Sequence, residues 1–391
     1  MAERRFDIVL FGATGFTGGL TAEYLAANAP AETRWALAGR NQSKLEGVRT
    51  RLAAQYPQAA ELELLRADVT DPDSIKAVAE ATKVVITTVG PYLSYGEPLV
   101  AACAVAGTDY VDLTGEPEFV DTMWLRHDEQ ARASGARIVH SCGFDSIPYD
   151  LGTLFTVEQL PENVPLRVQC FVQAGGTFSG GTYHSAINAF ARVRQSLQVA
   201  KERRGREPRP AGRRVHGEGK PHRSEVVGGW VVPFPTIDPQ NVLRSAAQLD
   251  RYGPDFTYSH YLVTKNLPMT AGLALGAGGA VALAQLPPTR KLMLKIKDPG
   301  QGATPEQRAK AWFRVRFAGE GGGKRVLTQV SGGDPGYTET SKMLAESALC
   351  LAFDDLPQRS GQITPAVAMG DALRRRLDAA GIKFEVLDGV G

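Results

Sequence analysis

The sequence predicts an α/β protein, with a doubly wound parallel sheet at its start and a second α+β domain of largely antiparallel sheet behind it. Short apolar runs alternate with helix-like stretches up to about residue 150, and alternating strands return at 164–174 and 312–330. The 391 residues also exceed what a single core usually holds. We expect domains over residues 1–150 and 151–335, and C-terminal helices over 336–391 that return to the first domain.

The first apolar run, Phe6–Phe11, is followed at once by Gly12, Gly15 and Gly18 and then by a helix-like run. This order is typical of a Rossmann dinucleotide site. The first glycine permits the tight turn, the second lets the backbone approach the pyrophosphate, and the third lets the helix lie close to the strand. The alternative is a tight turn without a ligand. The predicted cofactor contacts in this turn are Gly12, Thr14, Gly15, Phe16, Thr17 and Gly18.

The end of the second predicted strand indicates which dinucleotide binds. NAD sites usually carry an acidic residue there, whereas this chain has Arg40, and a guanidinium suits a 2′-phosphate. We therefore expect NADP(H), held by Arg40 with help from Asn41 and Lys44. The alternative is that Arg40 is a solvated residue at a helix start. Asp68 and Val69 follow the third strand, where the adenine often lies, although this stretch also resembles a cap for the next helix.

The remaining elements of the first domain follow the same alternation. Strands are expected at 61–66, 83–88, 108–112 and 137–141, and helices at 42–55, 72–80, 96–106 and 118–134. In the second half we expect a strand at 164–174, a helix at 184–200, a hairpin at 312–318 and 325–330, and helices at 340–353 and 364–379.

Composition excludes several classes of protein. A net charge of +2 with 43% hydrophobic residues describes a globular protein and no nucleic-acid binder. The four cysteines are far apart and form no CxxC pair, which predicts a reducing compartment and no metal site. The first residues lead directly into a strand and show no signal peptide, so a cytoplasmic location is expected.

Two unusual segments have two interpretations each. Residues 267–286 carry no formal charge but consist mainly of Ala and Gly, which argues against a membrane span. We expect a helix packed against protein or a dimer partner, ended by Pro287 and Pro288, with peripheral membrane contact as the alternative.

Residues 201–223 are strongly basic, and we expect a mobile surface loop or a docking site for an acidic partner.

Six phrases together resemble the saccharopine dehydrogenase-like oxidoreductases, and within them most closely the trans-acting enoyl reductases, which act with polyketide synthases that lack a working reductase domain in complex lipid assembly. The resemblance implies NADPH, a Rossmann domain with a second α+β domain, and a homodimer. It also implies an acyl thioester substrate, on an acyl carrier protein or a polyketide synthase. The phrases are Gly12–Gly18, Thr88–Val100, Gly107–Glu116, Cys142–Asp150, Gly333–Thr340 and Thr364–Asp371.

Enoyl-thioester reduction needs a hydride for the β-carbon, a group that polarises the carbonyl and a proton for the α-carbon. In a doubly wound sheet these groups should lie on loops after the strands. Gly90 and Pro91 are expected beside the nicotinamide ribose, with Tyr92 as a neighbour. The candidate catalytic residues are Tyr92, Tyr95 and Asp145. The tyrosines could instead only pack there, and Asp145 could cap the following helix.

Other polar residues receive weaker assignments. Asp112 and Glu116 could line the cleft, His184 and His260 are expected to be structural, and Cys142 to be a packed side chain. Two further functions stay open. A saccharopine-type amino-acid dehydrogenase would need a cationic pocket, and no arginine cluster lies near these motifs. A non-catalytic NADP-binding scaffold protein would keep the nucleotide site alone.

Overall fold

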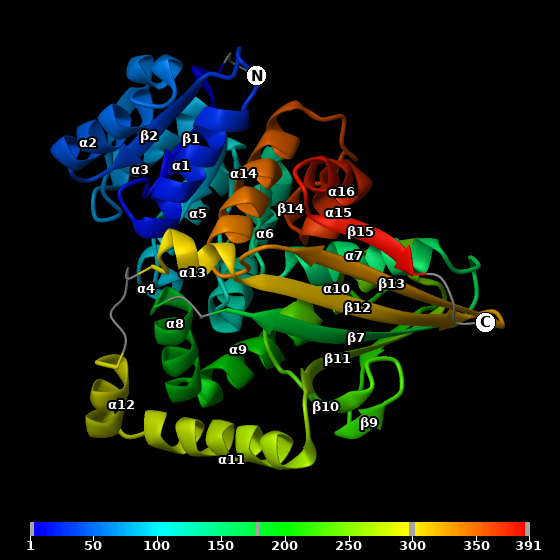
Figure 1. Ribbon diagram of the computed structural model, residues 1–391. Coiled ribbons are helices and arrows are strands. Elements are labelled where there is room, and N and C mark those ends of the chain that lie inside the picture. The colour runs from blue at the N-terminus through cyan, green and yellow to red at the C-terminus, as the bar shows by residue number, and fades with distance from the viewer. Residues whose placement is uncertain (1–3, 177–179, 297–301, 388–391) are drawn as a thin grey trace.

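The computed structural model describes residues 4–176, 180–296 and 302–387 and contains two sheets (Figure 1). The first sheet is entirely parallel, with the strand order β14-β6-β5-β4-β1-β2-β3. This is the Rossmann order extended by one strand, and it confirms the predicted fold class. Its strands are β1 (Phe6–Phe11), β2 (Trp35–Gly39), β3 (Glu63–Arg66), β4 (Thr82–Thr87), β5 (Asp109–Val111), β6 (Arg137–Val139) and β14 (Gly361–Gln362).

Helices cover both faces of this sheet. Alternate residues of β1 point to opposite sides and all are apolar or buried, so each face needs a covering layer. Ile8 and Leu10 pack with α1 and α2, whereas Val9 and Phe11 pack with α3, α5 and α6. The helices of this domain are α1 (Phe16–Asn28), α2 (Gln42–Ala53), the 3₁₀ helix η1 (Pro57–Glu61), α3 (Pro72–Ala81), α4 (Tyr92–Tyr95), α5 (Glu97–Ala106) and α6 (Pro117–Ser134).

The second sheet is mixed and runs β15-β13-β12-β7-β11-β10-β9, with β8 on β11. Strand β11 pairs in parallel with β7 and β8, and the other pairings are antiparallel. The predicted hairpin is present, and Gly322 and Gly323 turn it with positive φ values of 56° and 78°. The strands are β7 (Leu166–Gly175), β8 (Arg214–Gly217), β9 (His222–Ser224), β10 (Gly229–Pro233), β11 (Asp255–Thr264), β12 (Trp312–Gly321), β13 (Lys324–Gly332) and β15 (Lys383–Leu387).

The helices of the second half serve different partners. Helices α7 and α10 pack on the second sheet, whereas α9 packs on α6 of the first domain. They are α7 (Ile147–Glu158), α8 (Gly180–Ala191), α9 (Val193–Arg206), α10 (Asp238–Gln248), the 3₁₀ helix η2 (Asp250–Tyr252), α11 (Leu267–Ala284), α12 (Pro287–Leu294), α13 (Pro305–Ala309), α14 (Thr338–Phe353), α15 (Pro365–Ala368) and α16 (Gly370–Ala379).

The last part of the chain contributes to both halves of the molecule. Helix α14 packs against α1, β14 extends the parallel sheet, and β15 forms an edge of the mixed sheet. A continuous cluster of buried apolar side chains runs from Ile8 through Leu344 to Phe317 and so joins the two sheets. The domain boundaries at residues 150 and 335 stay a prediction.

Two helices expected to be continuous are broken. The run 184–200 divides at Arg192, which has φ −117° and ψ 18° and whose Nε donates to Glu118 Oε2 on α6 at 2.9 Å. The run 364–379 divides before Gly370, whose φ of +45° lies in the left-handed region. In both cases a tertiary contact or a glycine overrides the helical periodicity.

The segment 201–223, expected as a mobile surface loop or a docking site, is not one continuous loop, because parts of it lie in regular elements, and docking of an acidic partner stays a prediction. Helix α9 continues to Arg206, and β8 and β9 follow. Arg203 is 3% exposed, and its Nη1 lies 3.1 Å from Asp121 Oδ1 on α6. Arg213 donates to the backbone oxygens of Ala246, Leu249 and Gly253. These two arginines therefore have structural partners.

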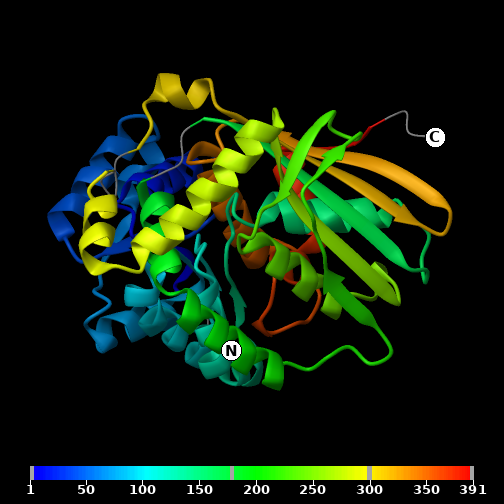
Figure 2. The same cartoon turned by 90° about the horizontal axis from the view of Figure 1, so that it is seen from below.

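The Ala/Gly-rich segment forms the predicted helix, α11, on the outer side of the molecule (Figure 2). Its N-cap is Asn266, whose Oδ1 accepts the N–H of Met269 at 2.9 Å. Pro287 and Pro288 end α11 as expected, and they also begin the further helix α12. Among the helices of the described residues, none combines the length and the apolar character that crossing a membrane requires.

Candidate functional site

The glycine turn after β1 has the geometry that a pyrophosphate requires. Gly12 has φ +101° and donates its N–H to Ala38 O at 3.0 Å. A Cβ on Gly18 would lie 2.2 Å from Gly12 O, so only glycine permits this contact between helix and turn. A Cβ on the exposed Gly15 would meet Gly12 O at 3.4 Å, which leaves room on its outer side. The turn is therefore closely packed on the side of Gly18 and has space on the exposed side of Gly15.

The N-terminus of α1 faces this turn with its donors free of a side-chain cap. Gly15 is the N-cap and offers no capping side chain. Thr14 is exposed, and Phe16 and Thr17 are half-buried. A helix start without a cap presents N–H groups and a partial positive charge to an anion, so these residues fit a dinucleotide phosphate.

Two residues from the end of the chain also reach this turn, and sequence reasoning missed both. The ring of Tyr337 packs edge-on against the ring of Phe16, with centroids 4.9 Å apart. The guanidinium carbon of Arg308 lies 6.0 Å from the centroid of the same Phe16 ring. The phrase Gly333–Thr340 was the available signal, because it includes Tyr337, but its role depends on the tertiary fold.

The ends of β2 and β3 form the second part of the cofactor site. Arg40 and Lys44 are exposed, and neither has a carboxylate partner in the described part of the chain. Asn41 caps α2, since its Oδ1 accepts the N–H of Lys44 at 3.0 Å. Arg66, which we had not predicted, lies opposite Gly39 in the β2–β3 register. Two exposed cations and a third nearby fit a 2′-phosphate.

The loop after β3 is held by its own side chains. Asp68 Oδ1 accepts the Thr70 N–H at 3.0 Å and the Thr70 hydroxyl at 2.8 Å. These bonds, and then the charges of Arg40 and Arg66, lower the pKa of Asp68. Asp71 caps α3, and Val69 is half-buried beside this loop. The residue that caps the following helix is thus Asp71 and not Asp68. Contact of Asp68 and Val69 with the adenine stays a prediction.

At the carboxyl end of β4 the structure separates the two candidate tyrosines. Gly90 is exposed and Pro91 half-buried, at the place expected for the nicotinamide ribose. The Tyr92 hydroxyl donates to Thr87 O at 3.2 Å and accepts the N–H of Leu113 at 3.2 Å. Burial raises the pKa of Tyr92 well above its usual value. Tyr95 is 46% exposed. The Tyr92 proton is therefore committed to a backbone oxygen.

Asp145 lies where the loops after β5 and β6 meet. A Cβ on Gly115 would be 3.2 Å from Asp145 Oδ2, so the carboxyl group packs directly on the β5 loop. The side chain is half-buried, and burial raises its pKa to about 6. The predicted cap at this helix start is absent, since no side chain caps α7 at Ser146. Asp145 thus combines partial exposure with a carboxyl pKa that burial brings closer to neutral.

Two buried residues of the second domain lie behind Asp145. Burial, and then the charge of Asp145, raise the pKa of Asp238 well above its usual range. Burial lowers the pKa of His260 to about 3. His260 Nε2 lies 3.7 Å from Asp238 Oδ2, and its Nδ1 lies 3.0 Å from the Tyr258 hydroxyl. We expected His260 to be structural, and no local motif in the sequence marks Asp238.

This cluster contains unsatisfied polar atoms, which native interiors rarely keep. Within the described residues, Asp238 Oδ1 and His260 Nε2 have no hydrogen-bond partner. The ring of Tyr149 packs edge-on against His260, with centroids 5.0 Å apart. Asp238 and His260 therefore form a buried polar cluster beside Asp145, and aromatic rings pack around His260.

Asp112 and Glu116 are buried and have structural partners. Asp112 Oδ1 accepts the N–H groups of Ser141 and Thr114, and its Oδ2 lies 2.6 Å from His140 Nδ1. Glu116 accepts the Leu93 N–H at 2.9 Å and the Ser185 hydroxyl at 3.0 Å. These two carboxylates therefore hold the loops after β4, β5 and β6 in place by accepting their backbone N–H groups. Cys142 is buried, and burial raises the pKa of its thiol.

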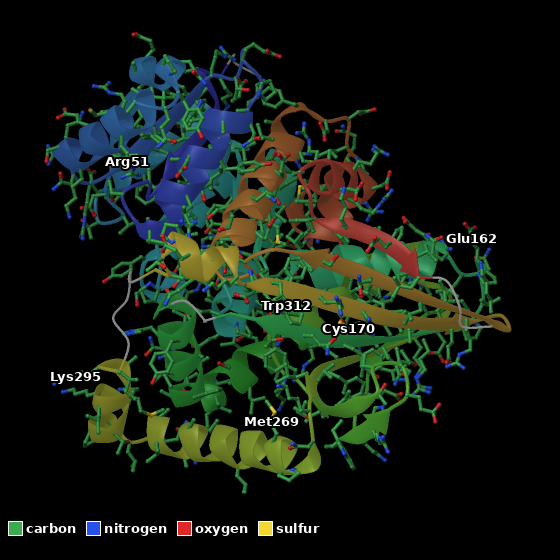
Figure 3. The ribbon with its side chains drawn as sticks, viewed as in Figure 1. Arg51, Glu162, Cys170, Met269, Lys295 and Trp312 are labelled. Atoms are coloured by element: carbon green, nitrogen blue, oxygen red, sulfur yellow. The ribbon has the colours of Figure 1, made fainter. Side chains whose placement is uncertain are left out.

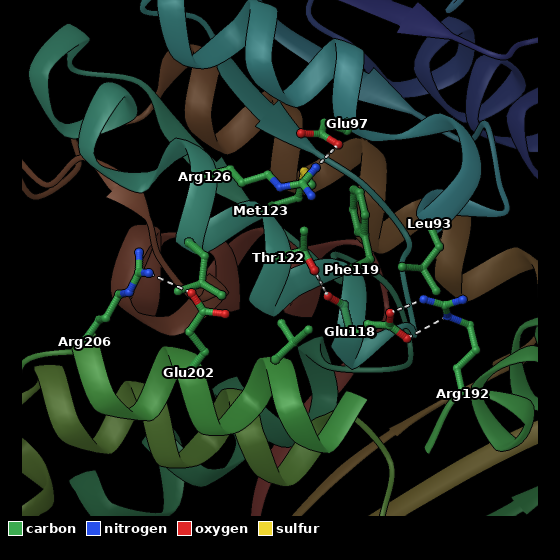
Figure 4. A pocket seen from close by; sticks show the side chains of 12 residues that line it. Leu93, Glu97, Glu118, Phe119, Thr122, Met123, Arg126, Arg192, Glu202 and Arg206 are labelled. Carbon is green, nitrogen blue, oxygen red and sulfur yellow. Dashed lines mark hydrogen bonds and ion pairs between the residues drawn. The ribbon is translucent and has the colours of Figure 1, made fainter. Parts of the chain in front are cut away.

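A separate cavity of about 540 Å³ lies between α6 and α9 (Figure 4). Its charged side chains are joined in pairs: Arg126 with Glu97, Arg192 with Glu118, and Arg206 with Glu202. Leu93, which follows Tyr92, also lines it. The paired charges make this cavity a polar seam between the two domains.

Known proteins are similar to this chain in sequence and in fold. The profile of the saccharopine dehydrogenase NADP binding domain matches residues 8–139. A Mycobacterium tuberculosis relative, provisionally named a trans-acting enoyl reductase, is 39% identical over 98% of this chain and 97% of its own. The trans-acting enoyl reductase of Mycobacterium bovis is 36% identical over 97% of each chain. The saccharopine dehydrogenase of Saccharomyces cerevisiae superposes with a TM-score of 0.57 over 98% of this chain and 100% of its own, at 12% identity.

The glycine turn, the cationic ends of β2 and β3 and the matching profile define an NADP-dependent oxidoreductase with a Rossmann domain. Within that class, the chain belongs to the saccharopine dehydrogenase-like family that includes the trans-acting enoyl reductases.

Proposed function

We propose that this oxidoreductase reduces the carbon–carbon double bond of an enoyl thioester with NADPH. The observation that carries the proposal is the half-buried Asp145 carboxyl, which has a pKa of about 6 at the mouth of the parallel sheet. The names of relatives at 36–39% identity support the same reaction. The substrate on a carrier protein or polyketide synthase, and a role in lipid biosynthesis, belong to the proposal.

The chain binds the cofactor with the glycine turn and, we propose, with Arg40 and Lys44 on its 2′-phosphate. When bound, NADPH supplies the hydride that the β-carbon of the substrate receives. Gly90 and Pro91 line the place of the nicotinamide ribose. The enoyl group then lies between this loop and Asp145, at the carboxyl ends of the strands.

Asp145 delivers the proton in this proposal. Its carboxyl O–H bond breaks, the proton bonds to the α-carbon, and Asp145 is left as a carboxylate that solvent reprotonates. Burial raises the pKa of Asp238 well above its usual range, so a second carboxyl group with raised pKa lies behind the site. The two tyrosines are weaker candidates for the proton donor than Asp145. The Tyr92 hydroxyl donates its hydrogen bond to Thr87 O, and the Tyr95 side chain is exposed to solvent.

A saccharopine-type reaction has less support. Its substrate carries several carboxylates, and no cation contributes to the pKa of Asp145. The likeness to the yeast saccharopine dehydrogenase, at 12% identity, concerns the fold.

The test follows NADPH absorbance with a long-chain trans-2-enoyl thioester, with NADH in parallel. We expect oxidation of NADPH in preference to NADH. Asp145→Asn should lower kcat about 10²–10⁴-fold and leave NADPH binding unchanged. Asp73→Asn, on exposed helix α3, is the matched control. An Asp145→Asn variant with normal turnover contradicts the proton-donor role.

NADPH binding without oxidation of the thioester contradicts the proposed substrate. In that case, oxidation with an amino-acid precursor would favour the saccharopine-type reaction, and no oxidation with either substrate would favour a binding protein. We also propose a homodimer through the second sheet and a cytoplasmic location, and sedimentation velocity tests the dimer.

A further inference from the structure

Exposed apolar side chains concentrate on one small part of this molecule. The described residues include twelve large apolar side chains that are exposed, and six of them lie between residues 269 and 296. Leu275 is 78% exposed, Leu292 68% and Ile296 72%. We call this region the α11–α12 surface, and its exposed apolar members are Met269, Leu275, Leu283, Leu286, Leu292 and Ile296.

Helix α11 is apolar on all sides and yet lies at the surface. Such a helix is normally buried in protein or in lipid. Here it contacts α8, α12 and the β10–β11 hairpin, and Figure 2 shows it crossing the lower face with no ribbon in front of it. Ala284 is buried at its end, but Leu275 and Leu283 remain in solvent. The expected packing against protein is therefore only partial, and a further layer is needed to cover this helix.

The formal charges within this segment are all positive. Residues 265–296 contain four basic residues, Lys265, Arg290, Lys291 and Lys295, and no Asp or Glu. Lys291 and Lys295 are exposed and four residues apart, which places them on one side of α12 and its end. Neither has a carboxylate partner in the part of the chain that the structure describes. Lys295 extends away from the body of the molecule (Figure 3).

We propose that the α11–α12 surface docks on a membrane surface that contains anionic lipids. Exposed aliphatic side chains on a surface helix suit the apolar side of the headgroup boundary, and the lysines of the adjoining α12 segment attract anionic headgroups. Helix α11 has 18 residues, so it would lie along the membrane over about 27 Å. This inference concerns attachment and is independent of the reaction proposed above.

Two other occupants fit the surface less well. A second copy related by two-fold symmetry would bring this basic surface against itself, and like charges repel. Protein interfaces are rich in Tyr, Trp and Phe, whereas residues 265–296 contain none of these. Their polar groups are also partly committed within the chain, since Gln285 Nε2 donates to Phe190 O and Thr289 Oγ1 to Leu286 O.

The experiment is co-sedimentation of the full chain with two kinds of vesicle, one of phosphatidylcholine alone and one in which about a third of the lipid is anionic phosphatidylglycerol. We expect binding to the anionic vesicles that weakens as salt rises. Replacing two lysines, Lys291→Gln with Lys295→Gln, should weaken partition more than about tenfold, because each basic residue near such a surface contributes about fivefold. Leu275→Glu should weaken it as well.

Matched controls separate this surface from a general effect of charge or hydrophobicity. Leu197→Glu changes a leucine on α9 that is 61% exposed, and Lys310→Gln removes an exposed cation after α13. Both should bind vesicles as the parent does, and all variants should keep NADPH binding, which shows that they are folded. Equal loss in the controls contradicts a site on α11 and α12.

Three further outcomes overturn the proposal. The first is absence of sedimentation with anionic vesicles, and the second is binding that ignores both salt and lipid charge. The third is a dimer in sedimentation velocity that Leu275→Glu dissociates, because it shows that a second copy covers this surface.

Discussion

The ring of Phe16, the first residue of α1, packs edge-on against the ring of Tyr337, with centroids 4.9 Å apart and planes at 73°. Tyr337 is 3% exposed and directly precedes α14, which packs along α1. The contact therefore joins the C-terminal part of the chain to the turn that we propose receives the cofactor phosphates. An aromatic edge contact of this kind contributes about 0.5–1.5 kcal/mol beyond burial.

We predict that Tyr337→Ala lowers both stability and cofactor affinity. Removing a buried aromatic ring should lower the free energy of unfolding by about 3–5 kcal/mol. Tyr337→Leu keeps most of the apolar volume and should stay folded, yet bind NADPH more weakly because Phe16 loses its support. Urea unfolding and NADPH fluorescence measure the two effects. Tyr95→Ala, at a 46% exposed site, is the stability control. Unchanged NADPH affinity in a folded Tyr337→Leu protein would show that the contact is only structural.

Two glycines of the cofactor turn should respond differently to alanine. A Cβ on Gly18 would lie 2.2 Å from Gly12 O, so Gly18→Ala should lower the free energy of unfolding by more than about 2 kcal/mol. Gly15 has an ordinary φ of −79°, and its Cβ would meet Gly12 O at 3.4 Å. Gly15→Ala should therefore change stability by less than about 1 kcal/mol and still weaken NADPH binding at least about tenfold. Thermal unfolding with and without NADPH distinguishes the two, and normal binding by Gly15→Ala argues against a pyrophosphate at this turn.

Replacing Arg40 should change the choice between the two dinucleotides. Loss of a charge-assisted hydrogen bond costs about 1.5–3 kcal/mol, so Arg40→Gln should weaken NADPH binding about 10–150-fold and leave NADH binding unchanged. Arg66→Gln, on the neighbouring strand, tests the cation that the sequence did not indicate. Fluorescence titration with both nucleotides gives the affinities. Lys76→Gln, exposed on α3, is the control, and equal losses for NADPH and NADH would remove the 2′-phosphate assignment.

Asp145 should make the protein less stable above pH 6. Burial raises the pKa of its carboxyl to about 6, so the folded state binds the proton more tightly than the unfolded state, whose pKa is near 3.8. The stability contributed by the protonated form is complete below about pH 4 and is lost as the pH rises through 6. Asp145→Asn, which stays neutral, should match the parent at pH 4 and exceed it by about 1–3 kcal/mol at pH 7.5.

Urea unfolding at the two pH values measures this difference. Asp150, whose pKa burial raises to about 7, titrates in both proteins and cancels in the comparison. Asp73→Asn should show no such dependence on pH. An equal stability difference at pH 4 and pH 7.5 would mean that the Asp145 carboxyl is not destabilised by burial.

The sequence alone determined the features that depend on neighbours along the chain. The strand, three glycines and helix at residues 6–28 predict the dinucleotide turn, because the φ of Gly12 and the close contact of Gly18 are local requirements. The alternation of strands and helices likewise predicts the parallel sheet, since each crossover must return along a helix. Arg40 directly follows the second strand, and its position there predicts the choice of NADP.

Only the tertiary structure decided which distant residues complete the site. Tyr337 and Arg308 reach Phe16 because α13 and α14 return to the first domain, and no pattern near residue 16 specifies this. Asp238 and His260 lie behind Asp145 because α10 and β11 fold against the start of α7. Their altered pKa values arise from burial, which is a property of the packed core. The exposure of α11 was equally hidden in the sequence, because apolar composition predicts a covered helix and only the packing shows which sides stay open.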